Sequence, residues 1–310
     1  RGQRIAYKQD YRYNGNGEGM NGLILLDKPT GFTSFKAAAA VRRIYGEKRV
    51  GHTGTLDPMA TGVLPILIGR ATRLCSLTLE ADKRYTATVR LGITTDSLDI
   101  TGEILSQSRP CVSDDELNSA LEHFFGTYDQ IPPMFSALKK DGVRLYDLAR
   151  KGEIVKREPR RVTIKELKLL NRDGDEFEID VLCSKGTYIR SLADDIGAFL
   201  GCGACLTALR RTATAQFEIS ECVTLEQLEE NPEKYLMSPE KAVEYLKSVN
   251  YSEPQARRFK NGAEIDAERV TMPYADDGEL IRVRCNGVFL GLAEYSADDR
   301  RLYTKCVIEG

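Results

Sequence analysis

The sequence predicts an α+β protein, with a larger domain built around a mixed or antiparallel sheet and a small C-terminal β-rich domain. Three observations lead to this prediction. The chain has 310 residues, which suggests about two domains at ~150 residues each. Strand-like runs follow one another with helices between and beside them, unlike the regular alternation of a βαβ array. The composition also changes at Tyr251, after which short strand-like runs and turns dominate.

The expected elements begin after an N-terminal extension. Residues 1–19 are polar and have no helical or strand period, so we expect them to lie outside the fold. A buried strand is expected at residues 23–26, ended by the turn-forming residues 28–31. Thr33 or Ser34 is a candidate N-cap for a helix over residues 35–45. The glycines and prolines of residues 51–58 predict a loop, after which residues 63–68 resume as a strand.

The remaining elements of the larger domain, residues 20–250, follow from the same kinds of pattern. Ser113 is a candidate N-cap for the helix at residues 114–125. Alternating β-formers predict a half-buried strand, and two further runs read as strands. We expect strands at residues 85–91, 161–170 and 177–184, and another helix at residues 188–200. An acidic helical stretch then leads to the second domain.

The second domain is expected over residues 251–310. Residues 252–259 read as a short capped helix. Strands are expected at residues 280–285, 288–295 and 301–307, and Asn286-Gly287 between the first two is a strong hairpin signal. The result is a compact β-rich domain of ~60 residues.

Charge is unevenly distributed in a chain that is almost neutral. The formal net charge is −2, but residues 138–162 hold nine basic and four acidic residues, a net +5. Residues 218–250 hold eight acidic and three basic residues, a net −5. One face could therefore bind a polyanion, although scattered solvated charge is the alternative. The apolar runs are far shorter than the ~20 residues that cross a bilayer, and no export signal is visible. We expect a cytoplasmic protein with reduced thiols.

Several kinds of chemistry are disfavoured by the residues present. The chain has two histidines, His52 and His123, too few for a His-rich metal centre. The pair Cys202 and Cys205 has the CxxC spacing found in one half of a zinc site or in a redox motif, but no second such pair accompanies it. Small buried residues are the favoured interpretation. No GxxxxGK[ST] motif is present. These observations disfavour a metal centre and nucleotide hydrolysis by a P-loop, and we expect no metal.

The loop over residues 51–65 has an unusual density of special residues. Its sequence, GHTGTLDPMATGVLP, places one carboxylate, Asp57, and the histidine His52 among three glycines and two prolines. Such a rigid loop suggests a functional site. The alternative is a structural turn, because Asp-Pro is a common turn pair.

This loop resembles the signature loop of the TruB-type pseudouridine synthases. Further segments that agree with the family in order are residues 26–34 (LDKPTGFTS), 83–85 (KRY), 94–99 (TTDSLD), 186–192 (GTYIRSL) and 206–211 (LTALRR). The resemblance covers residues 22–310, including a C-terminal part similar to the family's PUA-like domain.

The resemblance implies a role for each matching residue. Asp57 would be the catalytic nucleophile, Tyr85 would stack on the target uracil, and Arg190 would pair with the Asp57 carboxylate. The substrate contacts would be completed by His52, filling the gap left by flipped nucleotides, and by Tyr188 and Leu209, lining the base pocket. Cys205 departs from the family, since many relatives have a histidine there.

The function that the resemblance implies is isomerisation of the T-loop uridine of tRNA, uridine 55, to pseudouridine. This reaction involves no net redox change and no external energy source, so we expect no cofactor, but the base must leave its stack. An arginine beside Asp57 is expected to keep the pKa of its carboxyl low. The basic segment falls within a family insertion at about residues 130–160 that clamps RNA, so we expect backbone contacts from Lys139, Lys140, Arg150 and Lys151.

Two alternatives to a monomeric tRNA enzyme remain open. The chain could be the catalytic subunit of a guide-RNA particle, in which partners choose the substrate. The absence of a long Lys-rich tail and the bacterial-looking C-terminal part favour an enzyme without an obligatory protein partner. An RNA-folding chaperone that uses the same pocket is the other alternative, alone or together with catalysis.

Overall fold

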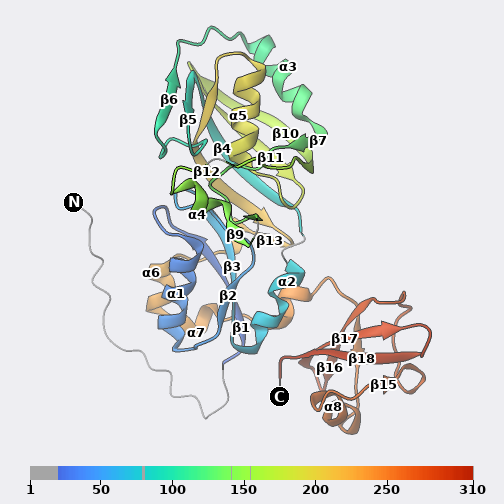
Figure 1. Cartoon of the computed structure of the whole chain (residues 1–310). Coiled ribbons are helices and arrows are strands. Elements are labelled where there is room, and N and C mark those ends of the chain that lie inside the picture. The colour runs from blue at the N-terminus through green and yellow to red at the C-terminus, as the bar shows by residue number, and fades with distance from the viewer. Residues whose placement is uncertain (1–19, 79–80, 141, 154, 310) are drawn as a thin grey trace.

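The computed structural model describes residues 20–78, 81–140, 142–153 and 155–309, without the side chains of residues 78, 140 and 144. The extension expected over residues 1–19 lies outside the described residues. Figure 1 shows an elongated larger unit built on one long sheet, with a separate small sheet at its lower end. This arrangement is the α+β architecture that the sequence predicts, with its β-rich C-terminal domain.

The larger sheet has nine strands in the described part of the chain. Its order is β1-β3-β12-β4-β11-β10-β7, with β2 paired to β3 and β13 to β12. The sheet is mixed, because β12 runs parallel to β3 and antiparallel to β4. The strands are β1 (Gly22–Lys28), β2 (Val50–His52), β3 (Thr61–Ile68), β4 (Lys83–Leu91), β7 (Gly126–Gln130), β10 (Arg160–Asp173), β11 (Glu176–Cys183), β12 (Ala204–Thr214) and β13 (Phe217–Glu218).

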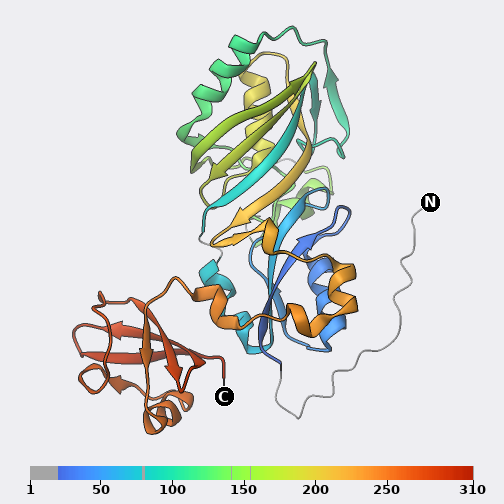
Figure 2. The ribbon, with the colours of Figure 1, turned by 180° about the vertical axis from the view of Figure 1, so that it is seen from behind.

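Two helices cover one face of the upper part of this sheet. They are α3 (Asp114–Phe124) and α5 (Ile189–Phe199), and Figure 2 shows the opposite face of the same strands from the front. The N-cap expected for α3 is confirmed, because Ser113 and Glu116 form a reciprocal capping box. Helix α5 begins one residue later than expected, since Tyr188 is its N-cap.

Helix α1 (Ser34–Tyr45) packs on the lower part of the sheet. Thr33, not Ser34, is its N-cap, and the Thr33 hydroxyl accepts a hydrogen bond of 3.0 Å from the Lys36 amide. The helix ends at Gly46, whose φ of 65° is the left-handed conformation that glycine adopts readily. The Ser34 hydroxyl is thereby free to bind the loop described below.

Strand β12 was missing from the sequence prediction, although it lies at the centre of the sheet. Its pairing with β4 contains two irregularities, between Leu206 and Ala208 and between Arg211 and Ala213. Each bulge shifts the side chains by one position, so the strand lacks the alternation by which strands are recognised. The acidic stretch also differs from a continuous helix, because it folds as the short elements α6 (Leu225–Glu230), α7 (Pro232–Tyr235) and η3 (Pro239–Val243).

Shorter elements connect these layers. Two small hairpins stand apart from the main sheet, β5 (Ile93–Thr95) with β6 (Ile104–Gln107), and β8 (Lys139–Lys140) with β9 (Val143–Arg144). The second hairpin and α4 (Leu145–Ala149) belong to the basic segment. The remaining helical turns are η1 (Gly69–Leu74), α2 (Cys75–Thr78) and η2 (Ile219–Glu221).

The C-terminal unit is a five-stranded sheet with one helix. Its order is β14-β16-β17-β18-β15, and it begins at Ser248, a few residues before the expected boundary. Its elements are β14 (Ser248–Asn250), α8 (Glu253–Lys260), β15 (Ile265–Asp266), η4 (Ala267–Arg269), β16 (Leu280–Cys285), β17 (Val288–Ser296) and β18 (Arg301–Val307). The expected hairpin is confirmed, since Asn286 and Gly287 have φ values of 50° and 82° between β16 and β17.

The edge strand β1 packs against both the larger unit and the C-terminal unit. Ile24 and Leu26 pack into the core beneath α1, whereas Leu23 and Leu25 face the other way. The second face belongs to an apolar cluster that Phe289, Leu292 and Ile308 of the C-terminal unit share. Successive strand residues point to opposite sides of a sheet, so the four apolar residues 23–26 of β1 supply two cores.

Among the described helices, none combines the length and apolar character that a membrane crossing requires.

Candidate active site

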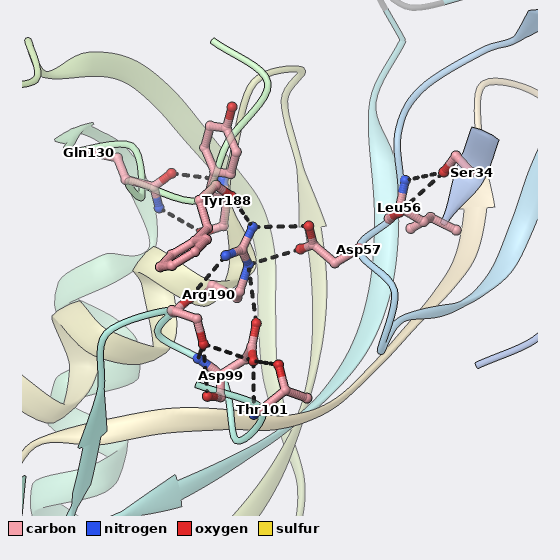
Figure 3. A network of polar contacts seen from close by, with 10 residues as sticks. Ser34, Leu56, Asp57, Asp99, Thr101, Gln130, Tyr188 and Arg190 are labelled. Atoms are coloured by element: carbon pink, nitrogen blue, oxygen red, sulfur yellow. Dashed lines mark hydrogen bonds and ion pairs between the residues drawn. The ribbon is translucent and has the colours of Figure 1, made fainter. Parts of the chain in front are cut away.

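The loop between β2 and β3 is held by the first residue of α1. The Leu56 amide donates a hydrogen bond of 2.8 Å to the Ser34 hydroxyl, and this hydroxyl donates to the Leu56 carbonyl at 3.2 Å. The Gly31 amide donates to the Pro58 carbonyl at 2.7 Å. These bonds bracket Asp57 on both sides, as Figure 3 shows for Ser34 and Leu56. The loop therefore has a fixed shape and presents the carboxylate at its tip.

Arg190 binds the Asp57 carboxylate through two parallel hydrogen bonds (Figure 3). Its Nε donates to Oδ2 at 2.9 Å and its Nη2 to Oδ1 at 3.0 Å. Two further bonds of 2.9 Å, from Nη1 to the Ser97 carbonyl and from Nη2 to the Phe135 carbonyl, fix the guanidinium. This is the pair that the family resemblance implies. Its bidentate geometry aims the carboxylate as well as balancing its charge.

Asp99 is a member of this network that the sequence analysis missed. Its Oδ2 lies 3.9 Å from Arg190 Nε, and the residue is buried. The Thr101 amide and the Ser97 hydroxyl each donate to Asp99 Oδ1 at 3.0 Å. The TTDSLD segment places a carboxylate among hydroxyl residues, but Arg190 lies 91 positions further along the chain, and no local pattern links the two.

The pKa of the Asp57 carboxyl is raised, contrary to the expectation from Arg190 alone. Burial raises this pKa most, and the nearby Asp99 carboxylate raises it further. Arg190 and Lys28 lower the pKa but do not outweigh these effects. Burial of the carboxyl, together with the second carboxylate at the same guanidinium, explains why the pair does not hold the pKa below its usual range.

Tyr85 and Leu209 come from neighbouring central strands and are both buried in the main core. Tyr85 lies on β4 and Leu209 on β12. The Asp57 carboxylate is near enough to influence the pKa of the phenols of both Tyr85 and Tyr188. Burial raises the pKa of Tyr85 to about 12. The structure therefore gathers two aromatic rings around the Asp57–Arg190 pair.

His52 ends β2, at the start of the loop that carries Asp57. Burial and the Arg211 guanidinium lower the pKa of its imidazole, and its Nδ1 is buried without a hydrogen-bond partner among the described residues. A neutral imidazole results at neutral pH. An uncharged ring with few polar contacts is suited to stacking.

The basic segment packs against a residue that binds the site. Phe135, whose carbonyl accepts a hydrogen bond from Arg190, lies just before this segment, and its ring contacts Tyr146 of the helix α4 within it. Lys139, Arg150 and Lys151 are exposed, and the Arg150 guanidinium lies 4.4 Å from the centre of the Tyr146 ring. The side chain of Lys140 lies outside the described residues. The exposed cations thus stand on an element that touches the catalytic network.

Among the described residues, the side chains of the two cysteines considered for metal or redox chemistry form no hydrogen bond with Asp57, Arg190 or Asp99. Cys205 is buried in the strand β12, and Cys202 precedes it in a turn. Among the described residues, no group of three or more His, Cys, Asp or Glu side chains is arranged to hold a metal ion.

Comparisons with known proteins agree with this geometry. The model of the TruB family pseudouridylate synthase N-terminal domain matches residues 42–189, and that of the tRNA pseudouridylate synthase B C-terminal domain matches residues 190–249. The tRNA pseudouridine synthase B of Azoarcus sp. (strain BH72) is 44% identical over 287 residues, covering 91% of this chain and 93% of that protein. Its counterpart in Clostridium perfringens (strain 13) is 43% identical over 279 residues, covering 89% and 95%.

Solved structures share the fold. A chain of an H/ACA RNP bound to a substrate RNA containing 2′-deoxyuridine superposes with a TM-score of 0.71 at 24% identity, covering 93% of this chain and 85% of that one. A chain of a Cbf5-Nop10-Gar1 complex gives 0.69 at 26% identity, covering 93% and 83%. The identity to the curated relatives extends over nine-tenths of the chain, and the signature loop carries a paired aspartate. The chain belongs to the TruB family of pseudouridylate synthases.

Proposed function

We propose that this chain isomerises uridine 55 in the T-loop of tRNA to pseudouridine, by nucleophilic catalysis from Asp57 on a flipped-out base. The observation that carries the proposal is the bidentate Asp57–Arg190 pair, held at the tip of a rigid loop in a TruB-family chain. The names of the curated relatives support tRNA as the RNA.

The site residues named above are sufficient for the proposed isomerisation. The glycosidic bond between N1 and the ribose breaks, the uracil turns, and C5 joins the same ribose carbon. Asp57, with 32% of its side chain exposed, can reach the ribose while Arg190 fixes its orientation. Tyr85 stacks on the uracil, Tyr188 and Leu209 line its pocket, and His52 fills the gap that the flipped base leaves. No cofactor takes part.

We propose that the basic segment supplies affinity rather than sequence recognition. Lys139, Lys140, Arg150 and Lys151 contact phosphates, and phosphate contacts position an RNA without reading its bases. Selectivity then comes from the shape of the T-arm and from the flipped nucleotides. The C-terminal unit adds a second RNA contact as a PUA-like domain. The enzyme acts as a monomer.

The decisive experiment uses the purified full chain and unmodified tRNA, with site-resolved detection of pseudouridine. We expect product at position 55 without any added protein or guide RNA. The Asp57→Ala variant should form none, while its affinity for tRNA stays within roughly tenfold, or about 1.4 kcal/mol. If the parent chain alone formed no product, the proposal would be contradicted and the guide-RNA alternative would be favoured. A chain of similar fold, Cbf5, is found in a complex with other proteins.

The same binding surface supports an RNA-folding activity, which we propose as a second role. Because this role needs binding but not chemistry, the Asp57→Ala variant should accelerate refolding of misfolded tRNA as well as the parent does. Loss of refolding in this variant, at unchanged affinity, would contradict the second role only.

A further inference from the structure

Arg211 is the largest side chain that the fold buries completely. It lies on β12 with none of its surface exposed. Its Nε donates a hydrogen bond of 2.8 Å to the Val63 carbonyl on β3, and its Nη2 donates to the Gly54 carbonyl at 3.3 Å. The guanidinium therefore joins the central strand to the loop that carries Asp57.

This guanidinium is incompletely satisfied. Among the described residues, Nη1 is buried without a hydrogen-bond partner, and no carboxylate lies within ion-pair distance of Arg211. Gly54 has a φ of 107°, and a Cβ there would lie 3.4 Å from Nη1, so the glycine lets the loop backbone approach the cation closely. A buried charge and an unused donor both cost stability. Because burying Arg211 lowers the stability of the fold in these two ways, we infer that this residue has a role other than packing.

The partner that the sheet register gives to Arg211 is Tyr85. The two residues are directly opposite on the antiparallel strands β12 and β4, so their side chains project from the same face. The charged and titratable groups near enough to act on the phenol are Arg211 from β12, Cys183 from β11 and Asp57 from the loop. Burial raises the pKa of this phenol most, and the positive charge of Arg211 acts in the opposite direction.

We propose that Arg211 is a positioning residue for Tyr85, whose guanidinium fixes the phenol oxygen beside the Asp57 loop and stabilises negative charge on that oxygen. The proposal rests on the proposed function. The proposal concerns the last step of that reaction. In this step C5 must lose its hydrogen after the new carbon–carbon bond has formed.

The proton balance explains why a cation is needed there. The phenol first gives its own proton to water and becomes a phenolate. The C5–H bond then breaks, its electron pair restores the double bond of the uracil ring, and the proton passes to the phenolate oxygen. One proton is released to solvent, and N1 later takes one up. A fixed cation beside the oxygen makes the phenolate state less costly without moving during the reaction.

The test combines a substitution with a change in phenol acidity. Arg211→Met should lower the single-turnover rate at saturating tRNA on the order of 10²-fold, the loss typical of removing one preorganised donor. Replacing Tyr85 by 3,5-difluorotyrosine, a more acidic phenol, should restore most of that loss in the Arg211→Met protein. The same replacement in the parent protein should change the rate far less.

Controls separate this role from support of the loop. Arg210→Met, which removes the neighbouring arginine paired with Asp27, should keep the parent rate and should not respond to the fluorinated tyrosine. If Arg211→Met does not fold, Arg211→Lys takes its place, because lysine keeps the charge with fewer donors. Its single-turnover rate should fall less than that of Arg211→Met, and 3,5-difluorotyrosine should again restore most of the loss. Equal losses with tyrosine and difluorotyrosine would overturn the proposal. Pseudouridine formation by the parent and by Arg210→Met reports on the proposed function separately.

Discussion

Gln130 holds the backbone of Tyr188 at two points. Its Nε2 donates a hydrogen bond of 3.1 Å to the Tyr188 carbonyl, and its Oε1 accepts one of 2.8 Å from the Tyr188 amide. Tyr188 is the N-cap of α5 and makes no side-chain capping bond. The buried Gln130 side chain on β7 thus fixes the backbone at the start of the helix, two residues before Arg190, as Figure 3 shows.

We expect Gln130→Ala to lower the single-turnover rate by roughly tenfold, because a small displacement of Arg190 misaligns the Asp57 carboxylate. The affinity for tRNA should change by less than about twofold, since Gln130 lies behind the site. Rapid-quench kinetics and filter binding measure the two quantities. The matched control is Gln216→Ala, which removes an exposed glutamine bonded to the Lys241 carbonyl. A loss of affinity at an unchanged rate would refute this positioning role.

The raised pKa of Asp57 predicts an acid limb in the pH–rate profile. In the proposed mechanism Asp57 acts as the carboxylate, so the rate should fall as the pH is lowered through a pKa that lies above the ordinary value of 3.8. Asp99→Asn removes a negative charge that raises this pKa, and should move the limb to lower pH even where it reduces the maximal rate. Asp115→Asn, at an exposed position on α3, should leave the limb in place. An unmoved limb in Asp99→Asn would mean that another group titrates.

Two substitutions at Tyr85 separate its ring from its hydroxyl. Tyr85→Phe keeps the stacking surface, so tRNA binding and base flipping should survive while turnover falls on the order of 10²-fold or more. Tyr85→Leu should lose stacking as well as turnover. Release of tritium from C5-labelled uracil in tRNA measures the proton-removal step. Near-normal tritium release from Tyr85→Phe would assign proton removal to another group.

Neutralising the basic segment should change the salt dependence of binding. The fourfold substitution of Lys139, Lys140, Arg150 and Lys151 by glutamine should reduce the slope of log affinity against log salt by up to about 3 units, since each phosphate contact contributes roughly 0.7 to 0.9. Asp147→Asn with Glu153→Gln, in the same segment, should not reduce it. An unchanged slope in the fourfold variant would show that these side chains do not touch RNA.

Lys28 predicts a pH dependence of stability that is independent of RNA. Its ammonium is fully buried and donates hydrogen bonds of 2.6 Å to the Phe32 carbonyl and 3.0 Å to the Pro29 carbonyl. Burial lowers its pKa from 10.5 to about 8. Below pH 8 both states are protonated and the folded state bears the full cost of the buried charge. Above pH 8 the folded state loses its proton first, so the free energy of unfolding should rise.

The rise should reach at most about 1.4 kcal/mol per pH unit. Urea denaturation between pH 7.5 and 9.5 measures it, and Lys28→Met should flatten the curve relative to the parent. Lys165→Met, at an exposed lysine paired with Asp82, serves as the control. Parallel curves for the parent and Lys28→Met would show that the ammonium keeps its proton in the folded state.

The sequence predicted local structure well where capping and alternation are strong. The capping box of Ser113 and the Asn286-Gly287 hairpin are contained in a few neighbouring residues, and both are present. Strand β12 was missed because two bulges break its alternation. Strand β12 is also parallel to its neighbour β3. No tight turn joins two parallel strands, so no turn sequence next to β12 indicates the pairing.

In the candidate site too, contacts between distant residues could not be predicted from local sequence patterns. Asp57 and Arg190 are separated by 133 residues, and no periodicity links them, so their pairing came from the family resemblance. Asp99 was missed because its role depends on where Arg190 lies in space. The direction of the Asp57 pKa was wrong for the same reason, since burial and the second carboxylate are properties of the folded chain.

The apolar cluster that Leu23 and Leu25 share with Phe289 and Ile308 has a consequence for any attempt to exchange parts of the protein. A chimera that carries the C-terminal unit of another family member would place a foreign surface against strand β1. Because β1 packs beneath α1 with its other face, a poor fit would be transmitted toward Ser34 and the loop it holds. Recombination between family members should therefore succeed when the donor supplies both halves of this contact together.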